Sequence, residues 1–201
     1  MRRTKEDALI TKREIIEKAV ELFLQNGFSK TTLDEIAQQA NVTRGAIYWH
    51  FKDKLDIVKE LIEEEHQWMT KKLDLIFKET LAPFAKMHKI IEEIVRNFFD
   101  NKTFQDFIEL TWFKIEYSQL ARLQTSKAEL TDYFIENFKR VIDEAQSAGE
   151  ISNEVNASDV TITITNMVNG MYRLYFILPE EVNTREEAMS LFNSYLNLIK
   201  A

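Results

Sequence analysis

The sequence predicts an all-α protein, and three observations lead to this fold class. The 201 residues include only 4 glycines and 2 prolines, so long helices with few interruptions are favoured over the strand-and-turn rhythm of a β protein. Apolar residues recur at spacings of three and four along most of the chain, which is the pattern of a buried helix face. Hydrophobic residues make up 45% of the sequence, enough to bury a sizeable core and to argue against a disordered chain.

The first predicted helix is an amphipathic support element that follows a basic arm. Its apolar face consists of Ile15, Ile16, Ala19, Val20 and Phe23. Gly27 is suited to end it, because glycine readily takes the left-handed conformation that closes many helices. The basic arm consists of Arg2, Arg3 and Lys5. It can lie along phosphates or in a minor groove, and a merely solvated terminus is an equal alternative.

The second helix and the turn after it carry clear local signals. Its apolar face, at positions i, i+3, i+4 and i+7, consists of Leu33, Ile36, Ala37 and Ala40. Thr32 and Glu35 predict a capping box, in which each side chain bonds the backbone N–H of the other residue. Asn41 tolerates a positive φ and therefore suits a tight turn. Thr43 is then the N-cap candidate of a third helix.

The third helix is unusual for a core element, because only one of its faces is apolar. Ile47 and Phe51 can pack inward, and Gly45 lies roughly opposite them, where a small residue permits close approach of another surface. Near Gly45 the sequence offers hydrogen-bond donors and aromatic rings, namely Arg44, Tyr48, Trp49, His50, Lys52 and Lys54. Such side chains bind guanine edges and phosphates, so a recognition helix in a DNA major groove fits the pattern. A surface helix with ordinary aromatic packing is the alternative.

The stretch TTLDEIAQQANVTRGAIYWHFKDK, residues 31–54, resembles the DNA-binding signature of the TetR family of bacterial regulators. The part TRGAIYWHFKDK is especially similar to the AcrR-type regulators of multidrug efflux. Asn41 departs from the pattern, because the family often has glycine there. The resemblance implies a TetR-like all-α fold of about nine helices. It places a three-helix helix-turn-helix domain over residues 1–52 and a helical effector-binding and dimerisation domain over residues 53–201.

The resemblance also implies DNA-binding roles for eight residues. Arg44 is the candidate for reading a base, and Gly45 permits close approach and can itself contact a base. The implied phosphate anchors are Thr32, Thr43, Tyr48, Trp49, His50 and Lys54.

A fourth, long helix is expected to bridge the DNA-binding domain to the body. Asp53 can cap it, and its apolar stripe begins with Leu55, Val58 and Leu61. Pro83 marks a break. Further helices are expected near residues 84–100, 104–121, 124–147, 158–178 and 185–199. Residues 160–165, VTITIT, alternate like a strand, but a lone strand there has no partner and we predict helix.

The body is rich in aromatic residues, which indicates either a plain core or a pocket for an apolar or cationic small molecule. TetR-type bodies generally enclose an effector pocket, and AcrR-type pockets accept many lipophilic drugs. The side chains implied to line it are His66, Met69, Ile94, Phe98, Ile108, Thr111, Trp112, Phe134, Phe138, Val168 and Asn169. Glu109 and Glu116 either face this pocket and favour cationic ligands or pair with neighbouring basic residues.

The last two helices are the expected dimer interface. Gly170 permits close helix approach there, and the family pairs these helices into a four-helix bundle across a two-fold axis. Because two-fold symmetry in the protein is matched by its binding site, the operator is expected to be a palindrome or near-palindrome.

Composition and charge limit the remaining classes of function. Net charge is −7, yet residues 1–59 carry 11 basic and 9 acidic side chains, so the acidic excess lies in the body. The absence of cysteine excludes disulfides and thiolate metal sites and fits a reducing cytoplasm. The expected location is cytoplasmic and, for a DNA-binding protein, nucleoid-associated. Neither a secretory signal nor a membrane span is expected.

Two other classes of protein compete with a DNA-binding regulator. Glu63 and His66 form one Glu-x-x-His, but a di-iron bundle needs two such motifs, so neither an enzyme nor a metal or other cofactor is expected. A helical interaction protein leaves the Arg44–Lys54 pattern unexplained. We therefore predict a homodimeric, ligand-responsive repressor, released from its operator by a small lipophilic effector, with an efflux operon as the family-level target. A TetR-type activator or a regulator of another pathway is the alternative.

Overall fold

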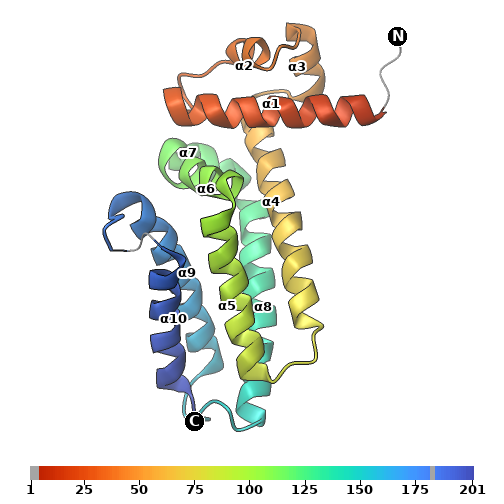
Figure 1. Cartoon of the computed structure of the whole chain (residues 1–201). Coiled ribbons are helices and arrows are strands. Elements are labelled where there is room, and N and C mark those ends of the chain that lie inside the picture. Colours follow the sequence, from red (N-terminus) through yellow and green to blue (C-terminus); the bar gives the residue numbers. More distant parts are fainter. Residues whose placement is uncertain (1–4, 182–183) are drawn as a thin grey trace. The chain divides into compact units, whose positions relative to one another are not determined.

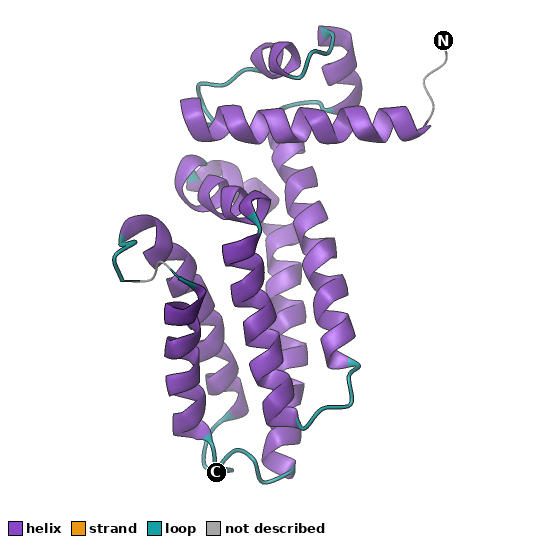
Figure 2. Ribbon diagram, in the orientation of Figure 1, coloured by secondary structure: helices purple, strands orange, loops and turns teal. Residues whose placement is uncertain are grey.

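The computed structural model describes residues 5–181 and 184–201, and these residues form ten α-helices joined by turns and loops (Figure 1, Figure 2). The helices are α1 (Lys5–Asn26), α2 (Leu33–Gln39), α3 (Arg44–His50), α4 (Lys54–Phe77), α5 (Pro83–Asp100), α6 (Lys102–Glu109), α7 (Tyr117–Leu120), α8 (Gln124–Ser147), α9 (Ala157–Ile177) and α10 (Arg185–Ile199). The prediction of an all-α fold is confirmed, with ten α-helices in the described residues where about nine were expected. Arg2 and Arg3 of the predicted basic arm lie outside the described residues.

The chain divides into two compact units. One contains Met1–Glu65 and Asp106–Lys127, and the other contains His66–Gln105 and Ala128–Ala201. The long helix α4 begins in the first unit and continues into the second. None of the helices within the described ranges has the length and apolar character needed to cross a membrane.

The first unit has an apolar core built by α1, α2, α3 and the start of α4. Its fully enclosed side chains include Ile15, Phe23, Ile36, Ile47 and Phe51. Each residue of this size contributes about 1.5–3 kcal/mol when it leaves water. The predicted inward faces of the first three helices are therefore confirmed, except that Ala40 is only partly buried.

Residues 102–123 of the chain depart from the expected single helix over 104–121. The α-helix ends at Glu109, a π-helical turn η1 spans Leu110–Lys114, and Ile115 is extended, with φ −106° and ψ 131°. The Ile115 N–H bonds the Leu110 carbonyl oxygen at 3.2 Å, the wider i→i+5 spacing that interrupts a regular helix. After this break come α7 and a 3₁₀ turn η2 (Ala121–Leu123). Periodicity of apolar residues could not reveal the break, because Leu110 and Ile115, at its two ends, are both buried.

The second unit packs α5 against α9 and α10. Its interior contains an aromatic cluster, in which the ring centroid of Phe98 lies 4.7 Å from Tyr172 and 5.0 Å from Tyr175. Residues 160–165 are part of α9, so the helical prediction for VTITIT is confirmed. The hydroxyls of Thr161 and Thr165 donate to carbonyl oxygens four residues earlier, at 2.8 Å, so both polar groups are satisfied within the helix.

Candidate nucleic-acid interface and effector region

The helix-turn-helix is fixed by its own local hydrogen bonds. The Thr32 hydroxyl accepts from the Glu35 N–H at 3.2 Å, and the Glu35 carboxylate accepts from the Thr32 N–H at 2.7 Å, so the predicted capping box is present. Asn41 has φ 53°, as predicted, and the Val42 N–H bonds the Ala37 carbonyl oxygen at 2.9 Å. This closure of α2 leads directly to Thr43, whose hydroxyl caps α3.

The outer face of α3 is exposed and carries the residues expected to contact DNA. Trp49 is 73% exposed and Tyr48 is 45% exposed, although both are large. The Arg44 side chain is also exposed, and its guanidinium lies 5.7 Å from the Tyr48 ring centroid and pairs with Asp34 at 3.1 Å. The rings of Trp49 and His50 make an edge-to-face contact at 4.5 Å. The structure thus brings all four side chains to one short helix.

Gly45 is not required by the packing of the chain itself. A Cβ atom built there would meet no atom closer than the Thr43 hydroxyl, at 3.9 Å. Glycine costs up to about 1 kcal/mol relative to alanine within a helix, so its presence in open space needs a reason outside the fold. The sequence-based expectation that a partner approaches the α3 backbone is consistent with this open space.

Lys54 lies at the start of α4 and contacts the turn that follows α1. Its ammonium donates to the carbonyl oxygens of Phe28 at 2.5 Å and Ser29 at 3.3 Å, and it lies 4.7 Å from the Phe28 ring centroid. Partial burial lowers the pKa of Lys54, and the negative charge of Glu35 opposes this effect. Asp53 accepts from the Asp56 N–H at 2.9 Å, which confirms it as the cap of α4.

The residues expected to bind an effector are divided between the two units. In the second unit Met69, Ile94, Phe98, Phe134, Phe138 and Val168 are buried, while His66 and Asn169 are partly buried. In the first unit Ile108 and Thr111 are buried, and Trp112 is 39% exposed. Phe134 and Phe138 stack at 5.1 Å. The second unit therefore brings most of these apolar side chains into its interior.

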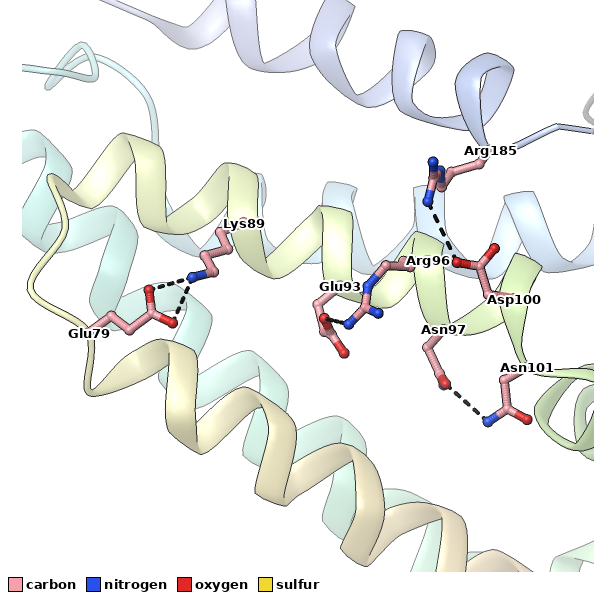
Figure 3. A network of polar contacts seen from close by, with 8 residues as sticks. All are labelled: Glu79, Lys89, Glu93, Arg96, Asn97, Asp100, Asn101 and Arg185. Carbon is pink, nitrogen blue, oxygen red and sulfur yellow. Dashed lines mark hydrogen bonds and ion pairs between the residues drawn. The ribbon is translucent and has the colours of Figure 1, made fainter.

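The sequence analysis missed a set of buried polar atoms in the second unit. The Glu93 Oε1, the Asn97 Nδ2 and the Thr70 hydroxyl are buried without a hydrogen-bond partner. Figure 3 shows Glu93 beside Arg96 on α5, and it shows the Asn97 Oδ1 accepting from Asn101 at 3.2 Å. A signal was present in the sequence, because Asn97 continues the apolar stripe formed by Ile90 and Ile94.

The two carboxylates expected either to face the pocket or to be paired have partners in the first unit. Glu109 pairs with Lys114 at 3.4 Å, and Glu116 accepts from the Ser29 hydroxyl at 3.2 Å. The Thr111 hydroxyl nearby is buried without a partner. Among the described residues, no three His, Asp or Glu side chains gather as a metal site.

Comparison with known proteins agrees with this geometry. Residues 15–61 match the description "Bacterial regulatory proteins, tetR family", and residues 82–201, more than half of the chain, match "MAATS-type transcriptional repressor, C-terminal region". The chain is 27% identical over 206 residues to the HTH-type transcriptional regulator TtgR of Pseudomonas putida, covering 100% of this chain and 96% of that protein.

Two solved structures have a similar fold. NalD, the secondary repressor of the MexAB-OprM multidrug efflux pump in Pseudomonas aeruginosa, superposes with a TM-score of 0.82 at 22% identity over 98% of each chain. The SmeT–triclosan complex superposes with a TM-score of 0.82 at 18% identity, over 96% of this chain and 92% of that one. At these identities the superpositions bear on fold alone. The helix-turn-helix and both family matches lead to the same conclusion: the chain belongs to the TetR family of bacterial regulatory proteins, as a DNA-binding transcriptional regulator with a MAATS-type repressor C-terminal region.

Proposed function

We propose that the protein is a homodimeric repressor that binds a palindromic operator in the cytoplasm and releases it when a small lipophilic molecule binds. Residues 1–52 are the DNA-binding domain in this proposal, and residues 53–201 bind the effector and form the dimer. The observation that carries it is the open space beside Gly45, on a helix whose opposite face is buried. A major groove is wide enough to admit such a helix.

The roles of the individual residues follow from where their polar atoms can reach. Arg44 is exposed at the first turn of α3 and reads a base, after exchanging its exposed contact with Asp34 for a guanine edge. The phosphates on either side of the groove are contacted by side chains of the same helix, namely Tyr48, Trp49 and His50. Further phosphate contacts come from the N-terminal ends of α2, α3 and α4, where Thr32, Thr43 and Lys54 lie.

A second copy of the chain is needed for a palindromic operator. The helices α9 and α10 expose large apolar side chains in the single chain, namely Ile162 at 51%, Leu191 at 50% and Leu198 at 83%. Burying such side chains favours association. A dimer through these helices places two recognition helices about 34–36 Å apart, or a multiple of this distance, on one face of the duplex.

The effector in this proposal is lipophilic and uncharged, and it carries a hydrogen-bonding group. The second unit offers aromatic and aliphatic side chains, whereas Glu109 and Glu116 already have partners. Asn97 Nδ2 and Glu93 Oε1 can orient a hydroxyl, which both accepts and donates. The efflux-pump repressor NalD and the triclosan complex of SmeT support a lipophilic effector and an efflux operon as target.

The ligand acts by favouring a conformation that does not fit DNA. It must bind that conformation more tightly than the DNA-bound one, because a ligand with equal affinity for both shifts nothing. Thr111 and Trp112 belong to the segment that responds in this proposal.

The test is binding of the purified protein to duplexes that cover the DNA flanking its own gene, measured by fluorescence anisotropy over a range of salt concentrations. We expect binding at a palindrome that weakens steeply with salt, and release by triclosan but not by its methyl ether. Binding that neither compound affects would remove the effector proposal and leave the DNA-binding function. No binding there or in a selection from genome fragments would overturn the whole proposal.

A further inference from the structure

The turn after α1 is held by several hydrogen bonds and a ring contact within the first unit. Gly27 has φ 88°, and its carbonyl oxygen accepts from both the N–H and the hydroxyl of Thr31, at 3.3 and 3.0 Å. The Thr31 hydroxyl also lies 3.3 Å from the Leu22 carbonyl oxygen, and Thr31 is 1% exposed. Phe28 is buried against Phe23, with ring centroids 5.0 Å apart. We call residues 27–31 the corner.

The corner contacts the proposed phosphate anchor on one side. The Lys54 ammonium bonds the carbonyl oxygens of Phe28 and Ser29 and lies over the Phe28 ring. Three contacts to one short stretch leave this long side chain little freedom. The position of the ammonium therefore follows the position of the corner.

The corner also contacts the segment 106–127. The Ser29 hydroxyl donates to the Glu116 carboxylate at 3.2 Å, although the two residues are 87 positions apart. Glu116 directly follows the extended residue Ile115, where the helix is interrupted, and it precedes α7. The helix α1 also packs against the π-helical turn η1, which carries Thr111 and its unpartnered hydroxyl.

We propose that the Ser29–Glu116 hydrogen bond couples the segment 106–127 to the phosphate anchor Lys54, with Ser29 and Glu116 as positioning residues. The inference rests on the proposed function, because it assigns a role in operator binding to two residues that do not touch DNA. Operator binding that draws Lys54 toward a phosphate pulls on the corner, and Glu116 transmits this to the segment. Such coupling is reciprocal in free energy. A conformational change in the segment 106–127 therefore alters operator affinity through the Ser29–Glu116 hydrogen bond.

The chain offers variants that separate this role from a merely structural one. Ser29→Ala and Glu116→Ala remove the hydrogen bond, whereas Ser29→Thr and Glu116→Gln keep a donor and an acceptor in place. Ser29 and Glu116 are both exposed, so all four variants should fold. Glu109→Ala is the matched control, because Glu109 pairs with Lys114 in the same segment and not with the corner.

The experiment compares amide hydrogen exchange of the full-length protein with and without the operator duplex, selected from genome fragments by the protein itself. In the unsubstituted protein and in Glu109→Ala, operator binding should slow exchange over residues 106–123 by about fivefold. In Ser29→Ala and Glu116→Ala this slowing should disappear, and the operator Kd should rise about three- to fivefold. In Ser29→Thr and Glu116→Gln, both the slowing of exchange and the operator Kd should be the same as in the unsubstituted protein.

The outcomes distinguish the inference from the function on which it rests. Failure to bind any duplex would reject the proposed function. Operator binding without slowed exchange over 106–123 would overturn the coupling. Slowing that persists in both alanine variants would show that the segment responds by another route, and it would also overturn the coupling.

Discussion

The helix-turn-helix and the second unit differ in how their polar side chains are satisfied. In the helix-turn-helix, Thr32, Glu35 and Thr43 each bond a backbone N–H three residues away. In the second unit, Glu93 and Asn97 each keep one buried polar atom without a partner. The local hydrogen bonds of the helix-turn-helix are thus complete in the single chain, and its proposed DNA-binding residues lie on the outside, whereas the second unit leaves buried polar atoms without a partner.

The difference has an energetic basis. A buried polar atom without a partner costs about 1–3 kcal/mol, and such atoms in folded proteins usually serve a ligand, a water or a strained site. Glycine at an exposed helix position is also a cost, but a smaller one. Each region therefore gives up stability where we propose that it binds a partner.

The largest expected effect comes from filling the space beside Gly45. Gly45→Leu should weaken operator binding at least about 100-fold, which corresponds to about 2.8 kcal/mol, because the new side chain occupies the volume that the DNA needs. The free energy of unfolding should stay constant or rise by up to about 1 kcal/mol, since the space is empty and leucine favours helix. Anisotropy and thermal denaturation measure the two quantities.

Gln25→Leu is the control for the added apolar side chain, because Gln25 is exposed on α1. It should leave operator affinity unchanged. If Gly45→Leu binds the operator as tightly as the unsubstituted protein does, α3 does not approach DNA through this face.

The next effect separates base reading from phosphate contact on the same surface. Arg44→Ala should cost about 1–3 kcal/mol at one base position and leave other positions unaffected. Lys54→Ala should weaken binding to all sequences alike and reduce the salt slope by about 1. Lys59→Ala is the matched control, since Lys59 on α4 pairs with Glu63 at 3.6 Å. The reverse pattern for Arg44 and Lys54 would exchange their roles.

Sequence was sufficient for the helix-turn-helix because its determinants are local. A cap acts on an N–H three residues away, and Asn41 takes its positive φ within a single turn, so each can be read from neighbouring letters. The assignment of DNA-binding roles needed the family resemblance in addition. It stays a prediction for each residue.

Sequence was insufficient for residues 102–123 and for the buried polar atoms because their determinants are distant. The π-helical turn packs against α1, more than 80 residues earlier, and the contact between Ser29 and Glu116 depends on that packing. Asn97 sits at a core position of α5, and only its surroundings decide whether the amide nitrogen finds a partner. No local pattern encodes such surroundings.

A third prediction uses Asn97 to test whether its buried amide serves a ligand. Asn97→Leu keeps the size of the side chain and removes the unpartnered nitrogen, but it also removes the hydrogen bond that the Asn97 Oδ1 accepts from Asn101, so the free energy of unfolding should rise by about 1 kcal/mol. Affinity for triclosan should fall about tenfold, because a hydrogen bond to the ligand is lost. Urea denaturation and calorimetric titration measure the two effects.

Asn137→Leu is the matched control, because the Asn137 amide donates to the Tyr133 carbonyl oxygen at 2.8 Å. This variant should lose stability rather than gain it. A loss of stability in Asn97→Leu as well would mean that water or protein atoms satisfy the Asn97 amide.

The smallest effect concerns Glu65, an acidic residue of α4 in the first unit that is partly buried. Burial raises its pKa to about 7, and the nearby charge of Glu64 adds to this. Because the carboxyl group holds its proton longer in the folded protein than in the unfolded chain, the free energy of unfolding falls as pH rises from about 4.5 to 7. Glu65→Gln removes this loss, so it should stabilise the protein by about 1–2 kcal/mol at pH 8, after allowance for solvent screening, and by less at pH 5.

Glu63→Gln is the control, since Glu63 is paired with Lys59 and should show no such gain at pH 8. Equal stabilisation by Glu65→Gln at both pH values would mean that ionisation of the carboxyl group is not the source of the effect.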